Sequence, residues 1–327
     1  MQALETILSA IPHLRALVVG DVCLDRWCRY DPALNDPSRE TGIPRTAVIA
    51  SELTPGAAGT VANNLAALGV GTVAVLGVIG EDGNGWELRR ALDQRGIGHD
   101  RCVPSSRFCT FTYTKLLNSQ TGEEDLARVD YINVTPLPEA EEAALVAAFN
   151  EAIPHYDVIL ISDQAETHQG GVITDAVRDA INAQAAQNPG KVFWVDSRRR
   201  PERFRHAVVK PNEDEAHAAL DRLGVPRQYR HLLEITQSPF LPVTHGDKGA
   251  LILDAHGETW VPTKPVSNPV DICGAGDSFS AGASLAYAIT KDPVTAVQFG
   301  NLVASITIMK KGTGTASPDE LRQANHA

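Results

Sequence analysis

The chain has 327 residues, enough for one large domain or two ordinary ones, and its 43% hydrophobic and 21% charged residues are typical of globular proteins. The formal net charge of −11 argues against a nucleic-acid surface, which needs a basic face. Five scattered cysteines fit reduced thiols, and neither a signal peptide nor a long apolar segment is evident, so the sequence predicts a cytoplasmic protein with no nucleic-acid or membrane partner.

The first half of the chain mixes regular and irregular stretches. The apolar run at 16–20 ends at Gly-Asp, as a buried parallel strand would. The residue patterns that follow predict a helix over 56–68, a strand over 72–79 and a helix over 86–94. Residues 22–54 are irregular, with a weak alternating patch at 47–53. A β-prone stretch at 108–117 (FCTFTYTKLL) follows, with 126–132 able to pair beside it.

The second half alternates regularly between helices and strands. Helices are predicted at 139–150, at 172–186, from Glu213 onward, at about 275–290 and at 293–309. Strands are predicted at 157–161, 191–195, 207–210, 241–244 and 250–253. This rhythm predicts an α/β fold with a doubly wound, mostly parallel sheet and helices on both faces. Segments 22–54 and 107–133 are interpreted as inserts that pair into a small separate sheet, a lid beside the ligand crevice.

One short motif carries clear chemistry, the stretch DICGAGDSFSAG at 271–282. Gly274, Ala275 and Gly276 open a predicted helix whose first N–H groups have no internal partner, so they form a site for an oxyanion such as a phosphoryl group. Asp277 follows directly, where it could accept the proton of an attacking hydroxyl. The alternative is an aspartate that only stabilises the first helical turn. No G-x-x-x-x-G-K-[ST] pattern occurs, which excludes a P-loop NTPase.

The chain resembles the ribokinase-like (PfkB) carbohydrate kinases over essentially its whole length. Residues 271–279 match that family's D-[TV]-x-G-A-G-D-x-F signature except at Ile272. Four further elements occur upstream in the family's order: Gly20-Asp21 with Asp25, the glycine signature at 55–69, Lys210-Pro211-Asn212-Glu213-Asp214-Glu215, and the T-x-G-x-x-G turn at 244–249. The resemblance implies one ribokinase-like kinase domain over 1–327, with the lid segments inserted.

The resemblance also implies roles for particular residues. Asp21 and Asp25 would bind sugar hydroxyls, with strand-end capping as the alternative. Thr244, Gly246 and Gly249 would border ATP, unless they form an ordinary strand-to-turn transition. Asn212 and Glu215 lie three residues apart, so one helical turn could aim both at a hydrated Mg²⁺; Asn212 could equally cap the helix. Asp271 would lie near a loop that binds a monovalent cation such as K⁺.

Two departures from the family pattern concern the sugar pocket. The glycine signature keeps Gly56, but the second glycine is replaced by Ala57, and Thr60 takes the place of an asparagine that contacts sugar in the family. A hydroxyl lacks the fixed donor and acceptor of an amide. Asn64, one turn from Thr60, either faces the pocket or packs in the core. The substrate specificity is therefore expected to differ from the family pattern.

Within the family, residues 20–27 and 126–130 look most like the heptose-phosphate kinase portion of ADP-heptose synthase. Arg128 is accordingly a candidate lid contact to a sugar phosphate, or else a surface ion pair. The run at 198–200 (RRR) is either a solvated loop or a clamp for a phosphorylated ligand.

The sequence therefore predicts a kinase that uses ATP and Mg²⁺ to phosphorylate a sugar or sugar phosphate, with a homodimer formed through the lid. The alternatives are a nucleoside kinase of the same fold and a non-catalytic sugar or nucleotide sensor.

Overall fold

The computed structural model describes residues 2–165 and 170–326. In this part of the chain, five strands form a central sheet in the order β11-β10-β9-β1-β4, and all neighbouring pairs are parallel. The strands are β1 (Arg15–Gly20), β4 (Thr72–Leu76), β9 (Val158–Asp163), β10 (Val192–Ser197) and β11 (Val208–Val209). The predicted mostly parallel sheet is thereby confirmed.

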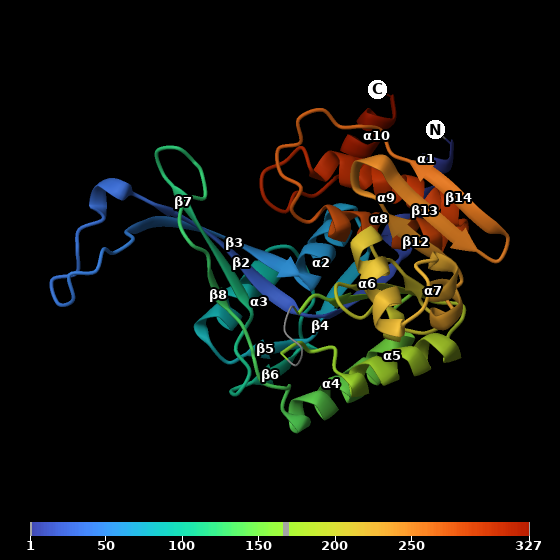
Figure 1. Ribbon diagram of the computed structural model, residues 1–327, viewed down its shortest axis with the longest axis horizontal. Coiled ribbons are helices and arrows are strands. Elements are labelled where there is room, and N and C mark those ends of the chain that lie inside the picture. Colours follow the sequence, from blue (N-terminus) through green and yellow to red (C-terminus); the bar gives the residue numbers. More distant parts are fainter. Residues whose placement is uncertain (1, 166–169, 327) are drawn as a thin grey trace.

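Helices cover both faces of the central sheet, because its strands are apolar on both sides. Leu17, Ile159 and Phe193 pack into one buried cluster, and their neighbours Val18, Leu160 and Trp194 pack into another. On the Val18 side lie α1 (Gln2–Ala10), α2 (Ala58–Ala67), α3 (Gly83–Asp93), α8 (Ala275–Thr290), α9 (Pro293–Thr307) and α10 (Pro318–His326). On the Leu17 side lie α4 (Glu139–Ala152), α5 (Asp175–Gln187), α6 (Glu213–Leu223) and α7 (Tyr229–Thr236) (Figure 1).

A four-stranded sheet projects from this body, to the left in Figure 1. Its strands are β2 (Val22–Tyr30), β3 (Val48–Ala57), β7 (Thr112–Asn118) and β8 (Val129–Tyr131), in the order β3-β2-β7-β8. The pairs β2–β3 and β7–β8 are antiparallel, whereas β2 and β7 run parallel. The predicted pairing of the two irregular segments is confirmed, and we call this unit the projecting sheet. Since β2 begins two residues after β1 ends, the sheet starts at the carboxyl edge of the central strands.

Smaller elements complete the described chain. The strands β12 (Leu241–Thr244), β13 (Gly249–Asp254) and β14 (Gly257–Pro262) form an antiparallel sheet, and β5 (Val78–Gly80) pairs with β6 (Val103–Ser105). Short 3₁₀ turns lie at Ile11–His13, Pro32–Leu34, Ile153–His155, Pro201–Arg203 and Gly246–Lys248. The predicted strand over 72–79 is corrected, because the chain breaks at Gly77 and its two halves, β4 and β5, join different sheets.

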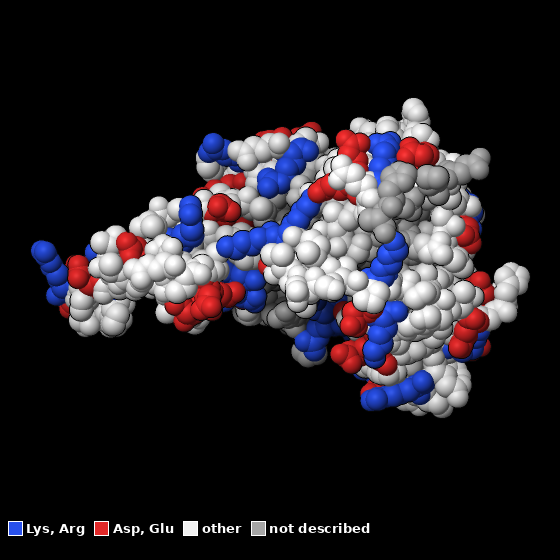
Figure 2. Space-filling view, turned by 90° about the horizontal axis from the view of Figure 1, so that it is seen from above, with Lys and Arg blue, Asp and Glu red and all other residues white. Residues whose placement is uncertain are grey.

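The surface carries charges of both signs. On the face shown in Figure 2, lysine and arginine side chains are interspersed with aspartates and glutamates, and uncharged residues cover much of the projecting end. Among the helices of the described residues, none combines the length and apolar character needed to span a bilayer.

Candidate active site

A cavity of about 180 Å³ lies where the projecting sheet meets the carboxyl ends of the central strands and the start of α8. Parallel sheets commonly bind ligands at this edge. Six residues singled out from the sequence line it: Asp25, Ala57, Thr60, Arg128, Gly274 and Asp277. Segments far apart in the chain thus converge on one site.

Asp277 lies in the first turn of α8, behind the glycine turn. Gly274 caps the helix in a left-handed conformation, with φ 78°, and its carbonyl accepts the first helical bond from the N–H of Ser278. The N–H of Ala275 donates instead to the carbonyl of Ile272 at 3.2 Å. The N–H groups of Gly276 and Asp277 therefore precede the helical ladder, and they are the better candidates for an anion site.

Charges of both signs surround Asp277. Burial and the nearby Asp196 carboxylate raise the pKa of Asp277 to about 7, although Lys210 and Arg198 act to lower it. Lys210 is 4% exposed and pairs with Asp196 at 3.0 Å. A side-chain carbon placed on Gly276 would lie 3.8 Å from the Lys210 ammonium nitrogen, so a buried cation lies behind the glycine turn. A carboxylate that titrates near neutral pH suits general base catalysis.

Asp25 faces the same cavity from β2. A side-chain carbon on Gly56 would lie 2.4 Å from Oδ1 of Asp25, so only glycine fits beside this carboxylate. Burial raises the pKa of Asp25 to about 6, against the opposing charges of Lys115 and Arg128. The Gly56 position of the glycine signature is thus explained by the packing of Asp25.

Two cations reach the cavity from the projecting sheet. Lys115 on β7 lies over the ring of Trp27, with its ammonium 4.5 Å from the ring centroid. Arg128 lies over the ring of Tyr113 and pairs with Asp130 at 2.8 Å. Aromatic rings therefore hold both cations at the cavity. Arg128 makes the ion pair considered from the sequence, and it also lines the cavity.

Ala57 and Thr60, the two residues that differ from the family pattern, lie in different surroundings. Ala57, at the β3–α2 junction, has φ 50° and ψ −115°, a conformation that residues with a side chain rarely adopt. Thr60 is 2% exposed, and its hydroxyl donates to the carbonyl of Pro55 at 3.4 Å. Asn64 is fully buried, donates to the carbonyl of Thr60, and does not line the cavity.

Asp21 lies beneath the cavity and does not line it. It is 1% exposed, and its carboxylate accepts backbone N–H groups of Gln164, Ala165 and Val172 at 2.8–2.9 Å. Burial raises its pKa to about 6, and the charge of Asp163 adds to the shift. This placement matches the capping alternative for Asp21, and neither Asp21 nor Asn64 lines the cavity in which a sugar would bind.

The two motifs assigned to the nucleotide lie side by side. Asn212 forms a bridge with Thr244, and the N–H of Thr244 donates to the carbonyl of Pro211. Asn212 also caps α6 in a reciprocal capping box with Glu215, at 2.8 Å in each direction. Gly246 opens the 3₁₀ turn after β12, and Gly249 begins β13. Burial raises the pKa of Glu215, while Lys210 opposes the shift.

Asp271 braces the glycine turn. One carboxylate oxygen accepts the N–H of Cys273 at 2.9 Å, and the other accepts the N–H of Gly312 at 3.1 Å. Across residues 2–165 and 170–326, no group of three or more His, Cys, Asp or Glu side chains is arranged to hold a metal.

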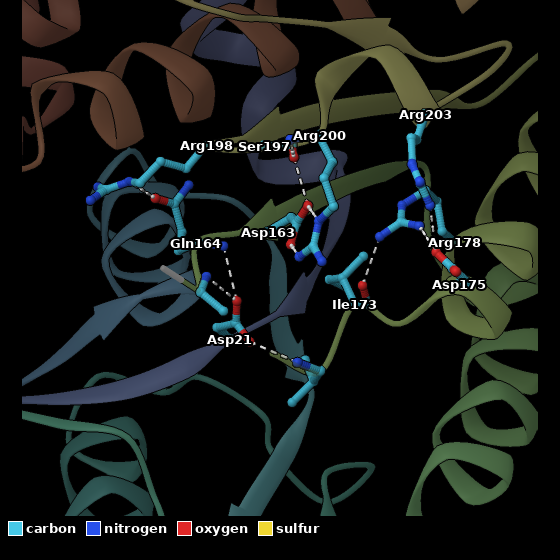
Figure 3. A network of polar contacts seen from close by, with 12 residues as sticks. Asp21, Asp163, Gln164, Ile173, Asp175, Arg178, Ser197, Arg198, Arg200 and Arg203 are labelled. Atoms are coloured by element: carbon cyan, nitrogen blue, oxygen red, sulfur yellow. Dashed lines mark hydrogen bonds and ion pairs between the residues drawn. The ribbon is translucent and has the colours of Figure 1, made fainter. Parts of the chain in front are cut away.

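Two of the three consecutive arginines, Arg198 and Arg200, have separate partners (Figure 3). The Arg198 Nε donates to Oε1 of Gln164 at 3.2 Å, and both residues line the cavity. Arg200 pairs at 2.6 Å with Asp163, which is 1% exposed. Arg199 is exposed. The run is therefore neither wholly a solvated loop nor wholly a clamp.

Seven lining residues were not assigned to the site from the sequence: Trp27, Tyr113, Lys115, Gln164, Arg198, Cys273 and Thr313. The sequence singles out Arg198 only within the arginine run, as part of a solvated loop or of a clamp for a phosphorylated ligand. Cys273 lies inside the glycine motif and could have been included on that ground. Trp27, Tyr113 and Lys115 carry no local signal, since the pairing of β2 with β7 brings them to the cavity.

Comparisons with known proteins show which family the chain resembles along most of its length. The model of the pfkB family carbohydrate kinases matches residues 17–320. The chain is 31% identical to the bifunctional protein HldE of Citrifermentans bemidjiense over 328 residues, covering 97% of this chain and 64% of that protein. It is 33% identical to HldE of a Caulobacter species, covering 93% of this chain and 61% of that protein. The chain thus spans less than two thirds of these relatives.

Solved structures show the same fold at low sequence identity. A ribokinase from Thermotoga maritima superposes with a TM-score of 0.71 at 21% identity, covering 96% of this chain and all of that one (100%). Phosphofructokinase-2 from Escherichia coli, in complex with potassium, gives a TM-score of 0.70 at 19% identity, covering 96% of this chain and 98% of that one.

Proposed function

Because this chain belongs to the PfkB family of carbohydrate kinases, we propose that it transfers the γ-phosphoryl group of ATP to a hydroxyl of a sugar phosphate. One observation carries the proposal: Asp277 shares its cavity with Asp25 and with the cations Lys115, Arg128 and Arg198. Two carboxylates suit a hydroxyl acceptor, and Lys115 and Arg128 on the projecting sheet suit an acceptor that is already anionic. Arg198 adds a third cation to the site. A heptose phosphate is the first acceptor to test, given the resemblance of residues 20–27 and 126–130.

In the proposed reaction, the two carboxylates have different roles. Asp25 accepts a hydrogen bond from the sugar and orients it. Asp277 accepts the proton of the attacking hydroxyl as its oxygen bonds to the γ-phosphorus, while the bond to the bridging oxygen of ADP breaks. The N–H groups of Gly276 and Asp277 stabilise charge on the transferred group, with Lys210 behind them.

Asn212, Glu215, Thr244, Gly246 and Gly249 are proposed to hold the nucleotide side. When bound, Mg²⁺ would neutralise charge on the ATP phosphates, with Glu215 and Asn212 contributing to its shell. We also propose that Asp271 shapes a loop able to bind K⁺, since its carboxylate joins the glycine turn to the segment at Gly312.

The projecting sheet is proposed to act as a lid. Trp27, Tyr113 and Lys115 belong to its strands and form one wall of the cavity. A small movement of that sheet would therefore close the acceptor site and exclude water, which protects ATP from hydrolysis.

The proposal is tested by ADP release over a panel of sugars, sugar phosphates and nucleosides. We expect turnover with sugar phosphates, and a loss of about 100-fold or more in Asp277→Asn. Thermal shifts with ATP and acceptor should persist in that variant, because it keeps the shape of the site.

Near-normal turnover by Asp277→Asn would exclude its role as base. Turnover with nucleosides alone would indicate a nucleoside kinase, and binding without ADP release would indicate a sensor.

A further inference from the structure

Arg198 comes from a different part of the fold than the other two cations of the cavity. Lys115 and Arg128 come from the projecting sheet, and their charges act on Asp25. Arg198 follows the central strand β10, and its charge acts on Asp277 and on Glu215 of the capping box. The cavity is therefore lined by cations from two parts of the fold, the projecting sheet and the carboxyl end of a central strand.

The backbone around Arg198 is anchored to a buried carboxylate. Asp163, at the end of β9, accepts the Ser197 hydroxyl at 2.6 Å and pairs with Arg200 at 2.6 Å. The carbonyl of Asp163 accepts the N–H of Arg198 at 3.0 Å. The residues on both sides of Arg198 are thus tied to one group that is 1% exposed, as Figure 3 shows.

The side chain of Arg198 is oriented by a second contact. Its Nε donates to Oε1 of Gln164 at 3.2 Å, and the N–H of Gln164 donates to the buried Asp21 at 2.9 Å. The Asp21 carboxylate therefore anchors the backbone of Gln164, and Asp163 anchors the backbone on both sides of Arg198. A guanidinium fixed in this way needs little reorganisation to meet an anion.

We propose that Arg198 is a catalytic residue that binds the phosphoryl group during its transfer, and that Gln164 is its positioning residue. The inference rests on the proposed function, in which that group passes from the nucleotide beside Glu215 to the hydroxyl beside Asp277. Arg198 shares the cavity with Asp277 and its charge acts on both carboxylates, whereas the charges of Lys115 and Arg128 act on Asp25.

The chemistry balances without proton transfer to or from Arg198. The acceptor oxygen bonds to phosphorus, the bond to ADP breaks, and the hydroxyl proton goes to Asp277. In the transition state, negative charge spreads over the oxygens of the transferred phosphoryl group. A fixed guanidinium stabilises this charge more in the transition state than in the bound substrates. Arg198 should therefore act on kcat more than on KM.

The test compares Arg198→Ala, Arg198→Lys and Gln164→Ala with Arg203→Ala, which removes an arginine paired with Asp175 outside the cavity. We expect Arg198→Ala to lower kcat about 100-fold, with either KM changing by less than about threefold. Arg198→Lys should recover part of the loss, and added guanidinium should restore part of the activity of Arg198→Ala. Gln164→Ala should show a smaller fall that disappears in the Arg198→Ala background.

Binding gives a readout independent of turnover. ADP, aluminium fluoride and acceptor together should raise the melting temperature of the wild type and of Arg203→Ala, but much less that of Arg198→Ala. A non-hydrolysable ATP analogue should stabilise all three alike.

A rise in the acceptor KM at unchanged kcat would overturn the proposal and make Arg198 an acceptor ligand. Equal losses in Arg198→Ala and Arg203→Ala would overturn it as well. Absence of wild-type turnover over the whole panel would instead count against the proposed function.

Discussion

At the scale of single residues, burial and the neighbouring charges together determine the pKa of Asp277. Burial and Asp196 favour its protonated form, whereas Lys210 and Arg198 favour the carboxylate. Its pKa of about 7 lies between the usual range of an aspartate and that of a strong base. Such a group both accepts a proton readily and releases it again at neutral pH.

This balance predicts how activity depends on pH. Asp277 can accept a proton only when ionised, so kcat/KM should rise with pH through about 7 and level off above it. Asp25, with a pKa of about 6, should steepen the fall on the acid side. The measurement is a pH–rate profile, with melting temperatures recorded at each pH as the control for unfolding. A flat profile through neutral pH would contradict the assignment.

The residues of the cavity differ in how far the sequence could predict them. Gly274 and Asp277 lie in a contiguous motif whose glycine turn and helix start are local, so their placement followed from the sequence. Trp27 and Lys115 meet because β2 and β7 pair in parallel, in a register that places them opposite each other. No local pattern encodes such long-range pairing.

At the scale of elements, the connection between β3 and α2 contains a strained residue, Ala57. Ala57 pairs with Val22 as the last residue of β3 and precedes the first residue of α2. Its φ of 50° and ψ of −115° are disfavoured for any residue with a side chain. Strain of this kind is found at functional sites, and this residue lines the cavity.

Relief of this strain should be measurable. Ala57→Gly should raise the free energy of unfolding by about 1 kcal/mol, because the relieved strain of about 1–3 kcal/mol exceeds the entropy that glycine adds to the unfolded chain. Ala58→Gly, next in the chain but fully buried, is the matched control and should lose about 1 kcal/mol. Urea unfolding of the two variants gives the comparison, and equal destabilisation would refute the strain.

Some elements were predictable and others were not, for physical reasons. The strands near 16–20 and 157–161 are continuous apolar runs, because both faces of a central parallel strand are buried. The break between β4 and β5 was missed, since Val78 and Ile79 stay buried while joining a different sheet. The helices α1 and α10 have nine residues each and α7 has eight, so each offers only about two turns over which a helical pattern can repeat.

At the scale of the whole molecule, the chain corresponds to part of longer relatives. It spans 64% of the HldE protein of Citrifermentans bemidjiense and 61% of that of Caulobacter, while the kinase family model covers residues 17–320. The fold and the family therefore describe nearly all of this chain.

The projecting sheet exposes many large apolar side chains. They are Leu34, Ile43, Val48, Ile49, Val129, Tyr131, Ile132 and Val134, each between 46% and 69% exposed. They all belong to the strands of this sheet, which Figure 1 shows projecting from the main body, or to the segments that adjoin those strands. Exposed apolar groups concentrated in one region usually mark a contact with another protein.

We propose that this surface joins two copies of the chain. Sedimentation or light scattering should then give twice the 35.0 kDa of one chain. The double variant Ile43→Lys/Ile49→Lys should give a single-chain mass, because buried lysines would be placed at the interface without partners. Trp260→Lys, at a residue 46% exposed on β14, introduces a lysine on another surface and should leave the dimer intact.

Dimer formation should also affect acceptor binding, because one wall of the cavity belongs to the same projecting sheet. If pairing holds the lid in place, the monomeric variant should bind the acceptor more weakly, with a raised KM and a smaller change in kcat. A wild type of single-chain mass at micromolar concentration would exclude the dimer. A dimer that survives both lysines would place the interface elsewhere on the molecule.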